Sequence, residues 1–353
     1  MRLVDKIFIF ILLLFSIQSL ANEGEGKGEV NAVESISNFI NDSHEWHFIT
    51  IGKTDIAIPL PVILYSEHTG LHIFSSHNLY KRQEKFPFYI SKEGLSREKI
   101  IEILPDGSQY VPFDVSITKT VIGSAIVALI LLIFFISGSG RTIRTPMEVP
   151  KGIQNVIEPL VLFVRDDIAK PFAGAKYNRY MPFLLTVFHF ILLANLIGLI
   201  LPLELNITGN ISVTCVLAVF TFIITTVSGN KHYWLHIINP DVPIFMKLPV
   251  PLIPFIEFLG IFIKPFVLMI RLFANMLSGH MIIGVLVTLI FLMSFLFNPI
   301  VGAGTSLISV AFSVFMLIVD LLVAFIQAYI FTLLSAMYFG MATDEGHVEK
   351  KKI

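Results

Sequence analysis

The sequence predicts a mainly α-helical, polytopic membrane protein with about five membrane crossings and a small β-rich domain outside the membrane. Of its 353 residues 55% are hydrophobic and only 14% are charged, and the mean hydropathy is +0.78. The apolar residues gather into stretches long enough to cross a bilayer. An amino-terminal region of mixed polarity precedes them, with short strand-like runs between turn residues. A chain this apolar cannot cover itself with a soluble surface.

The first 21 residues are typical of a secretory signal peptide. They carry Arg2 and Lys6, then a short apolar run at residues 7–17, and they end in Ser19-Leu20-Ala21. The run is too short for a spanning helix, and the small residues at its end are typical of a cleavage site. We therefore expect cleavage after Ala21, so that the chain that follows begins outside, in the periplasm.

Residues 22–116 are predicted to form the external β-rich domain. Pro105-Asp106-Gly107 is a turn signal and is expected to join two strands in a hairpin. The strand-like stretches are residues 55–65, 86–90, 100–104 and 109–117.

Residues 117–353 are predicted to form the membrane domain. Three stretches have about the 20 residues that one crossing needs, namely 117–136, which we expect to close at Gly138-Ser139-Gly140, 181–201 and 211–227. Two others, 251–297 and 301–341, are far longer. Each of these is expected to be a helix that is tilted, bent or partly in the membrane plane.

The basic residues predict the orientation of the chain. Those of the segment after the first span are Arg141, Arg144, Lys151, Arg165, Lys170, Lys176 and Arg179. Lysine and arginine are enriched on the cytoplasmic side of membrane proteins, and the tail ends in Lys350-Lys351-Lys352. Five crossings then place the amino terminus outside and the carboxyl terminus in the cytoplasm, in a bacterial inner membrane. Residues 153–169 are expected to form an amphipathic helix along the inner surface.

A polar stripe runs along the first long apolar stretch. Glu257, Lys264, Arg271 and Ser278 follow at intervals of seven, which return to within roughly 20° of the same helix face, and Asn275 joins them one turn after Arg271. A guanidinium stays protonated at any cellular pH, and holding it near the bilayer centre costs about 2.5 to 3.5 kcal/mol. We expect a functional reason for that cost.

The second long stretch repeats the pattern with Asp320, Gln327 and Tyr338, at spacings of seven and eleven. Polar side chains aligned inside apolar helices usually face a partner helix or a wet cavity, so two such faces predict an ion path. His280 lies nine positions after Arg271 and is expected to point to another side. Histidine and aspartate are suitable proton carriers, with unperturbed pKa values of about 6.5 and about 3.9.

In these residues the chain resembles subunit a of the F-type ATP synthase, the membrane stator that faces a rotating ring of subunit c. The resemblance covers residues 117–342, with weaker support at 195–199 and 208–214. Its most specific parts are Lys264-Pro265, Arg271-Leu272-Phe273-Ala274-Asn275 and Gln327-Ala328-Tyr329-Ile330-Phe331.

The resemblance implies roles for several residues. Arg271 is implied to be the essential stator arginine, and Gln327 its polar neighbour. Asn275, His280 and Asp320 match positions that line the outer half-channel.

On the inner side, Glu257 resembles an exit carboxylate. Gly198 stands where some members carry a channel carboxylate, so Glu204 is expected at the outer mouth instead. The implied partners are the subunit c ring, the peripheral stalk subunit b, other ATP synthase subunits and membrane lipid, with no nucleic acid and no cofactor.

Simpler interpretations of the same residues remain open. Arg271 would also fit a structural ion pair with Glu257 or Asp320. Lys264 would fit a snorkelling side chain, and Tyr338 an anchor at the inner membrane surface.

Other functional classes find less support. A secondary transporter with an intramembrane ion pair is the alternative, although such proteins usually show two related halves and this chain shows no internal repeat. No serine or cysteine stands beside a credible base and no phosphate-binding loop is present, so we expect no catalysis by the chain itself. The histidines of the amino-terminal domain lack the paired spacing of a metal site.

Overall fold

The structure is a computed structural model that describes residues 42–51, 54–80, 86–91, 99–104, 107–144, 154–200, 205–238 and 252–343. The predicted signal peptide lies outside these residues. The chain divides into two compact units, residues 1–125 with 200–205, and residues 126–199 with 206–353.

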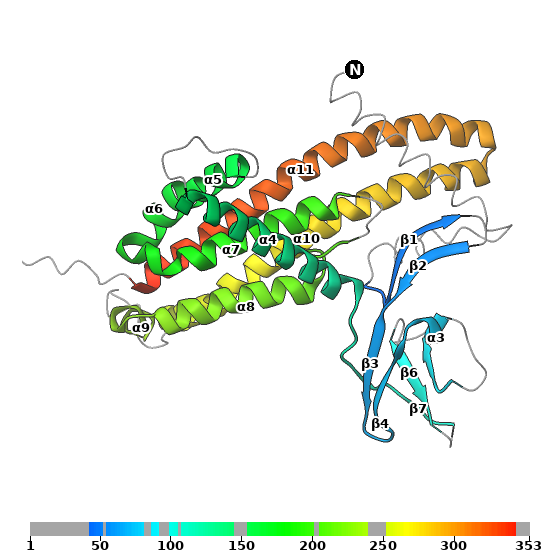
Figure 1. The fold of residues 1–353 in the computed structure, drawn as a ribbon, viewed down its shortest axis with the longest axis horizontal. Helices are drawn as coiled ribbons and strands as arrows, with labels where there is room; N and C mark the ends of the chain where they lie inside the picture. The colour runs from blue at the N-terminus through cyan, green and yellow to red at the C-terminus, as the bar shows by residue number, and fades with distance from the viewer. Residues whose placement is uncertain are drawn as a thin grey trace, which may run out of the picture. The chain divides into compact units, whose positions relative to one another are not determined.

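The first unit contains eight described strands and one short helix (Figure 1). β1 (Glu45–Ile51) pairs with β2 (Thr54–Pro59). β3 (Pro61–Ser66) lies between β4 (Gly70–Ser75) and β8 (Phe113–Asp114). β5 (Phe88–Ile90), β6 (Ile100–Ile103) and β7 (Gln109–Tyr110) form a third antiparallel sheet, and α3 (His77–Tyr80) follows β4.

The core of this unit lies under β3. Its alternate residues Val62 and Leu64 are fully buried and pack with Leu79, Phe88 and Ile100. This is the period of two expected of a strand with one face on a core. The single strand predicted at residues 55–65 is wrong, because the chain divides at Leu60 into β2 and β3, which belong to different sheets.

The predicted hairpin is confirmed, since Ile103 of β6 is paired with Gln109 of β7. Gly107 adopts φ 81°, a left-handed conformation that glycine takes without strain. The second strand is shorter than predicted. The chain leaves this sheet after Tyr110, and β8 pairs with β3 instead.

Hydrogen bonds join the strands of the first unit to the start of helix α4. The Lys119 amide donates to the Ser43 carbonyl at 3.2 Å, and the Thr120 amide donates to Asp42 Oδ1 at 3.3 Å. Nearby, Asp114 accepts hydrogen bonds from the His44 ring at 2.9 Å and from the Ser116 amide at 2.8 Å. Burial opposes ionisation of Asp114, but these hydrogen bonds outweigh it and lower the pKa of the carboxyl.

Five helices have the length and composition to cross a membrane, as predicted. They are α4 (Lys119–Arg144), α7 (Tyr177–Gly198), α8 (Ile211–Ser228), α10 (Leu252–Leu296) and α11 (Pro299–Thr343). The predicted closure of the first at Gly138-Ser139-Gly140 is wrong, because the helix continues to Arg144. A glycine costs about 1 kcal/mol relative to alanine inside a helix, which is too little to end one.

Shorter helices connect these five. Residues 154–169 are helical, as predicted, but consist of α5 (Gln154–Phe163) and a π-helical stretch, η3 (Val164–Ala169). α6 (Lys170–Ala173) and a 3-10 turn, η4 (Gly174–Lys176), lead into α7. After α8 the chain continues into α9 (Lys231–Ile238), a helix that was not predicted.

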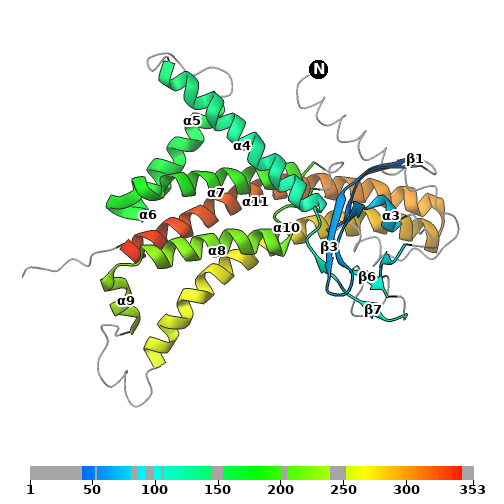
Figure 2. The same cartoon turned by 60° about the horizontal axis from the view of Figure 1, so that its bottom comes forward.

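The helices α10 and α11 form a long hairpin and lie side by side in both Figure 1 and Figure 2. Asn298 caps the start of α11, because its Oδ1 accepts from the Ile300 amide at 2.7 Å, and Pro299 occupies the first helical position. Each helix has 45 residues and is therefore about 68 Å long, whereas the apolar core of a bilayer is about 30 Å thick. Each helix is therefore more than twice as long as one crossing along the membrane normal requires.

Small buried residues allow α11 to pack closely on its neighbours α7, α8 and α10. They are Gly302, Ser309, Ser313, Ala324, Ala328, Ser335, Ala336 and Ala342. The far end of α11 is clipped to the α8–α9 connection, where the Asn230 amide donates to Ala342 O and Asn230 Nδ2 donates to Thr343 O, both at 2.9 Å.

Candidate functional site

The packing of α7, α10 and α11 brings most of the predicted site residues around one small cavity. Asn275 and His280 reach it from α10, and Asp320 and Gln327 from α11. The remaining lining residues are Asn195, Leu199, Leu272, Met276, Val323 and Ala324. Half of the lining is thus polar, inside helices that are otherwise apolar.

This cavity is suited to water rather than to an organic ligand. Its volume is about 10 Å³, close to the minimum that one water molecule needs. His280 and Gln327 are almost fully buried, at 7% and 6% exposure. Amide and imidazole groups both donate and accept hydrogen bonds, so they can hold a water between them.

Asp320 lies directly against the backbone of the opposite helix at Gly279. A Cβ atom added to Gly279 would lie 2.7 Å from Asp320 Oδ1 and 2.8 Å from Oδ2. Real Cβ atoms do not approach oxygen so closely, so only glycine leaves room for the carboxylate here. This contact fixes the position of Asp320 against α10 at Gly279, the residue before His280.

Arg271 lies one turn from Asn275 but is not among the residues that line the cavity. Its side chain is half-buried. Among the described residues no carboxylate lies within 4.0 Å of its guanidinium, which argues against the structural ion pair with Glu257 or Asp320.

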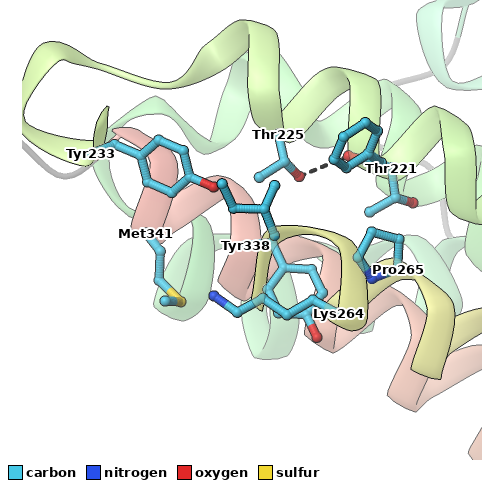
Figure 3. A pocket seen from close by; sticks show the side chains of 9 residues that line it. Thr221, Thr225, Tyr233, Lys264, Pro265, Tyr338 and Met341 are labelled. Atoms are coloured by element: carbon cyan, nitrogen blue, oxygen red, sulfur yellow. Dashed lines mark hydrogen bonds between the residues drawn. The ribbon is translucent and has the colours of Figure 1, made fainter. Parts of the chain in front are cut away.

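A second cavity, of about 20 Å³, lies between α8, α9, α10 and α11 (Figure 3). Lys264 and Tyr338 line it together with Pro265, Tyr233 and Met341, and further lining comes from Thr221, Phe222, Thr225 and Ile261. The Lys264 ammonium stands 5.6 Å from the centre of the Tyr338 ring, a cation–π arrangement.

Glu257 belongs to the surroundings of this second cavity. Burial raises the pKa of Tyr233, and the negative charge of Glu257 raises the pKa further. Glu257 therefore lies near α9, whereas His280 and Asp320 lie around the first cavity. The predicted polar residues thus form two groups along the hairpin, and on α10 Arg271 lies between Lys264 of one group and Asn275 of the other.

Ser278 lines neither cavity. Ser278 is exposed, and its hydroxyl donates to the Asn275 carbonyl of its own helix at 2.9 Å. Glu204 lies outside the described residues.

One pair of buried polar residues was not predicted as part of the site. Thr208 Oγ1 donates to Asn195 Oδ1 at 2.5 Å, and both residues are at most 1% exposed. Asn195 also lines the first cavity. The available signal was an asparagine within an apolar helix, which is expensive in a membrane unless it has a partner.

Comparison with known proteins identifies the family of this chain. The sequence pattern of the family described as ATP synthase A chain matches residues 121–340, more than half of the chain. The chain belongs to this family. Its fold of five candidate spans is therefore that of a multi-pass membrane protein, and the resemblance seen in the sequence is confirmed.

Individual relatives in the family carry the name ATP synthase subunit a. One from Chloroherpeton thalassium is 44% identical over 248 residues, covering 67% of this chain and 71% of the relative. The "ATP synthase subunit a 2" of Prosthecochloris aestuarii is 42% identical over 70% of this chain and 77% of its own length. A relative from Myxococcus xanthus is 42% identical over 66% of this chain and 75% of its own length.

The amino-terminal region matches something else. A pattern described as a domain of unknown function, DUF8433, matches residues 35–119. The part of this chain that belongs to the A chain family begins where that region ends.

Proposed function

We propose that this chain, a non-catalytic subunit by its family, conducts protons as the stator of an F-type ATP synthase through two offset half-channels. The observation that carries the proposal is the first cavity, which gathers Asn275, His280, Asp320 and Gln327 from two helices. Arg271 stands next to it without a described carboxylate partner. The partner that would complete the site is a carboxylate on a ring of subunit c.

The first cavity is proposed to belong to the outer half-channel. Imidazole and carboxyl groups, as on His280 and Asp320, are side chains that can accept and release protons, and the amides of Asn275 and Gln327 can hold water between them. A proton from outside would pass along this group to a carboxylate of subunit c. Once neutral, that carboxyl group can enter lipid as the ring turns.

Arg271 is proposed to separate the two half-channels. As a permanent cation it cannot relay a proton, but it favours the ionised form of a carboxylate that approaches it. No carboxylate among the described residues forms an ion pair with Arg271, so its charge is available to a carboxylate of the rotor. It would keep protons from passing straight between the two sides.

The inner half-channel is proposed to lie near Glu257. The second cavity is lined by Lys264, which lies between Glu257 and Arg271 on α10, and by Tyr338 of α11. Tyr233 lines it too and is within reach of the Glu257 charge. Each elementary charge that crosses 100 mV contributes about 2.3 kcal/mol to rotation.

The setting of the chain is part of the proposal. Residues 1–21 would be removed as a signal peptide, residues 22–116 would lie in the periplasm, and residues 117–353 would form the domain in the bacterial inner membrane with the carboxyl terminus in the cytoplasm. Peripheral stalk subunit b and the subunit c ring would be direct partners, and Glu204 would stand at the outer mouth.

Replacement of Arg271 by alanine tests the mechanism. In inverted membranes with assembled enzyme, Arg271→Ala should abolish ATP-driven acidification measured with a pH-sensitive dye. Arg165→Ala is the matched control, because Arg165 is exposed and paired with Asp166 at 2.8 Å, away from both cavities. Acidification that persists in Arg271→Ala would reject the mechanism.

The outer path has a separate test. His280→Ala should slow passive proton flux through membranes from which the catalytic head has been removed, and should shift the pH dependence of that flux. An unchanged pH profile would remove His280 from the path. Purification distinguishes the transporter alternative, since a transporter would be active alone and a stator should co-purify with a ring and a catalytic head.

A further inference from the structure

One face of the sheet β4-β3-β8 is apolar and has no role in the proton path. We define the apolar sheet face as Ile63, Tyr65, Leu71, Ile73 and Phe113. Leu71, Ile73 and Phe113 are 62%, 67% and 71% exposed.

These residues form a continuous surface. Tyr65 of β3 is paired with Leu71 of β4 on one side and with Phe113 of β8 on the other. Two residues before Tyr65 in β3, Ile63 is paired with Ile73 of β4. Side chains two apart in a strand point to the same face, so the two rows lie next to each other.

The opposite face of the same sheet already covers the core of the unit through Val62 and Leu64. A sheet that packs on a core with one face and meets water with the other shows polar residues on the outer face. The apolar sheet face departs from that pattern, and a contiguous exposed apolar patch marks a surface that something else covers.

The connection between the sheet and helix α4 indicates what covers the apolar sheet face. Pairing continues beyond β8, where the Val115 amide donates to Ile63 O at 3.0 Å and the Ile117 amide donates to Pro61 O at 3.2 Å. Helix α4, the first membrane span, begins at Lys119, and its first turns up to residue 125 belong to the same compact unit. Six residues separate Phe113 from Lys119, which limits the distance between them to roughly 20 Å. The sheet therefore lies near the start of α4.

We propose that the apolar sheet face rests on the lipid surface of the leaflet that α4 enters. Its chemistry fits that position. A tyrosine and a phenylalanine stand among aliphatic side chains, and aromatic residues are enriched at the boundary between headgroups and acyl chains. The face itself carries no charged residue that would lose hydration there. The β-rich unit would then set how the first span enters the bilayer, independently of the proton path.

Fluorescence of a single label tests this contact. Cys215 is the one cysteine of the sequence, so Cys215→Ser gives a background in which an introduced cysteine is labelled alone. We would attach an environment-sensitive dye to Ile73→Cys, and separately to Phe113→Cys, in the purified full chain in phosphatidylcholine vesicles. Glu67→Cys, exposed in the turn between β3 and β4, is the matched control.

The label at Ile73 and the label at Phe113 should lose most of their fluorescence to nitroxide-labelled phosphatidylcholine, and iodide in the water should quench them several-fold less than the label at Glu67. Strong iodide quenching at all three positions would overturn the proposal, since the face would then be in water. Protection from both quenchers would overturn it as well, because protein from this chain or a second copy would be covering the face.

Discussion

The contact between Gly279 and Asp320 allows a sharp test of the outer path by adding a single methyl group. Gly279→Ala introduces a Cβ atom 2.7 Å from Asp320 Oδ1, which is 0.7 Å short of the 3.4 Å at which ordinary contact begins. Either the carboxylate must move away or the two helices must separate. In both cases Asp320 is displaced relative to His280.

The size of the effect follows from this misfit. The carboxylate oxygens end a flexible side chain, so we expect them to turn aside by about the missing 0.7 Å at little cost in stability. A displacement of about 1 Å in a positioned reactive group can cost about 100-fold in rate. We therefore expect passive proton flux to fall at least about fivefold.

The same helix offers a matched control at Gly260. A Cβ atom added there meets nothing within 4 Å. Both replacements favour the helix by about the same 1 kcal/mol, since alanine replaces glycine in each. Only Gly279→Ala creates a contact, so the difference between the two variants isolates the position of Asp320.

The assay is dye-monitored proton flux in inverted membranes without the catalytic head, normalised to the amount of assembled complex. Gly260→Ala should conduct as the unaltered protein does. Equal flux in both variants would refute the reasoning, and so would an equal loss in both, because neither could then be attributed to Asp320.

Three further predictions follow from other contacts. Thr208→Val should leave Asn195 Oδ1 buried without its donor, at a cost of about 1 to 3 kcal/mol, and lower both the thermal stability of the complex and its proton flux, whereas Thr208→Ser should retain both. Gln327→Leu should remove a polar group from the first cavity and slow passive flux without preventing assembly, which co-purification would check; unchanged flux would count against a wet path. Because the pKa of Asp114 is lower in the folded than in the unfolded protein, ionisation of this carboxyl stabilises the β-rich unit. The stabilisation is complete above the unfolded pKa of about 3.9 and should be lost as pH falls through the folded pKa. Hydrogen exchange of residues 61–66 should show this loss, and Asp114→Asn should abolish the pH dependence of the exchange.

The membrane helices were predictable because a spanning helix requires a long stretch of apolar residues, which can be recognised without knowing its partners. The boundaries of α7 and α8 lie within a few residues of those predicted. The strands were harder, because β8 is defined by pairing with a distant part of the chain, as in the pair Leu64 and Asp114 of β3 and β8. The short helix α9 was not predicted, because its lysine and histidines interrupt any long apolar run.

The candidate site was predictable in its residues but not in its grouping. Helical spacing identified Asn275, His280, Asp320 and Gln327 one helix at a time. It could not show which residue of another helix faces them, so Asn195 and Gly279 were missed. A seven-residue interval drifts by about 20° per step, which is why the stripe through Arg271 ends on an exposed side at Ser278.

The helix α11 is fastened at both ends. Asn298 and the two-residue connection hold its start to α10, and the hydrogen bonds of Asn230 hold its last turn. A helix fastened in this way cannot slide by a turn of about 5.4 Å along its axis when it is pushed from the side. A force from the rotor on Asp320 or Gln327 would therefore be transmitted to the contacts at the two ends of α11. The helix would keep its position along α10, so Asp320 and Gln327 would stay opposite His280 and Asn275.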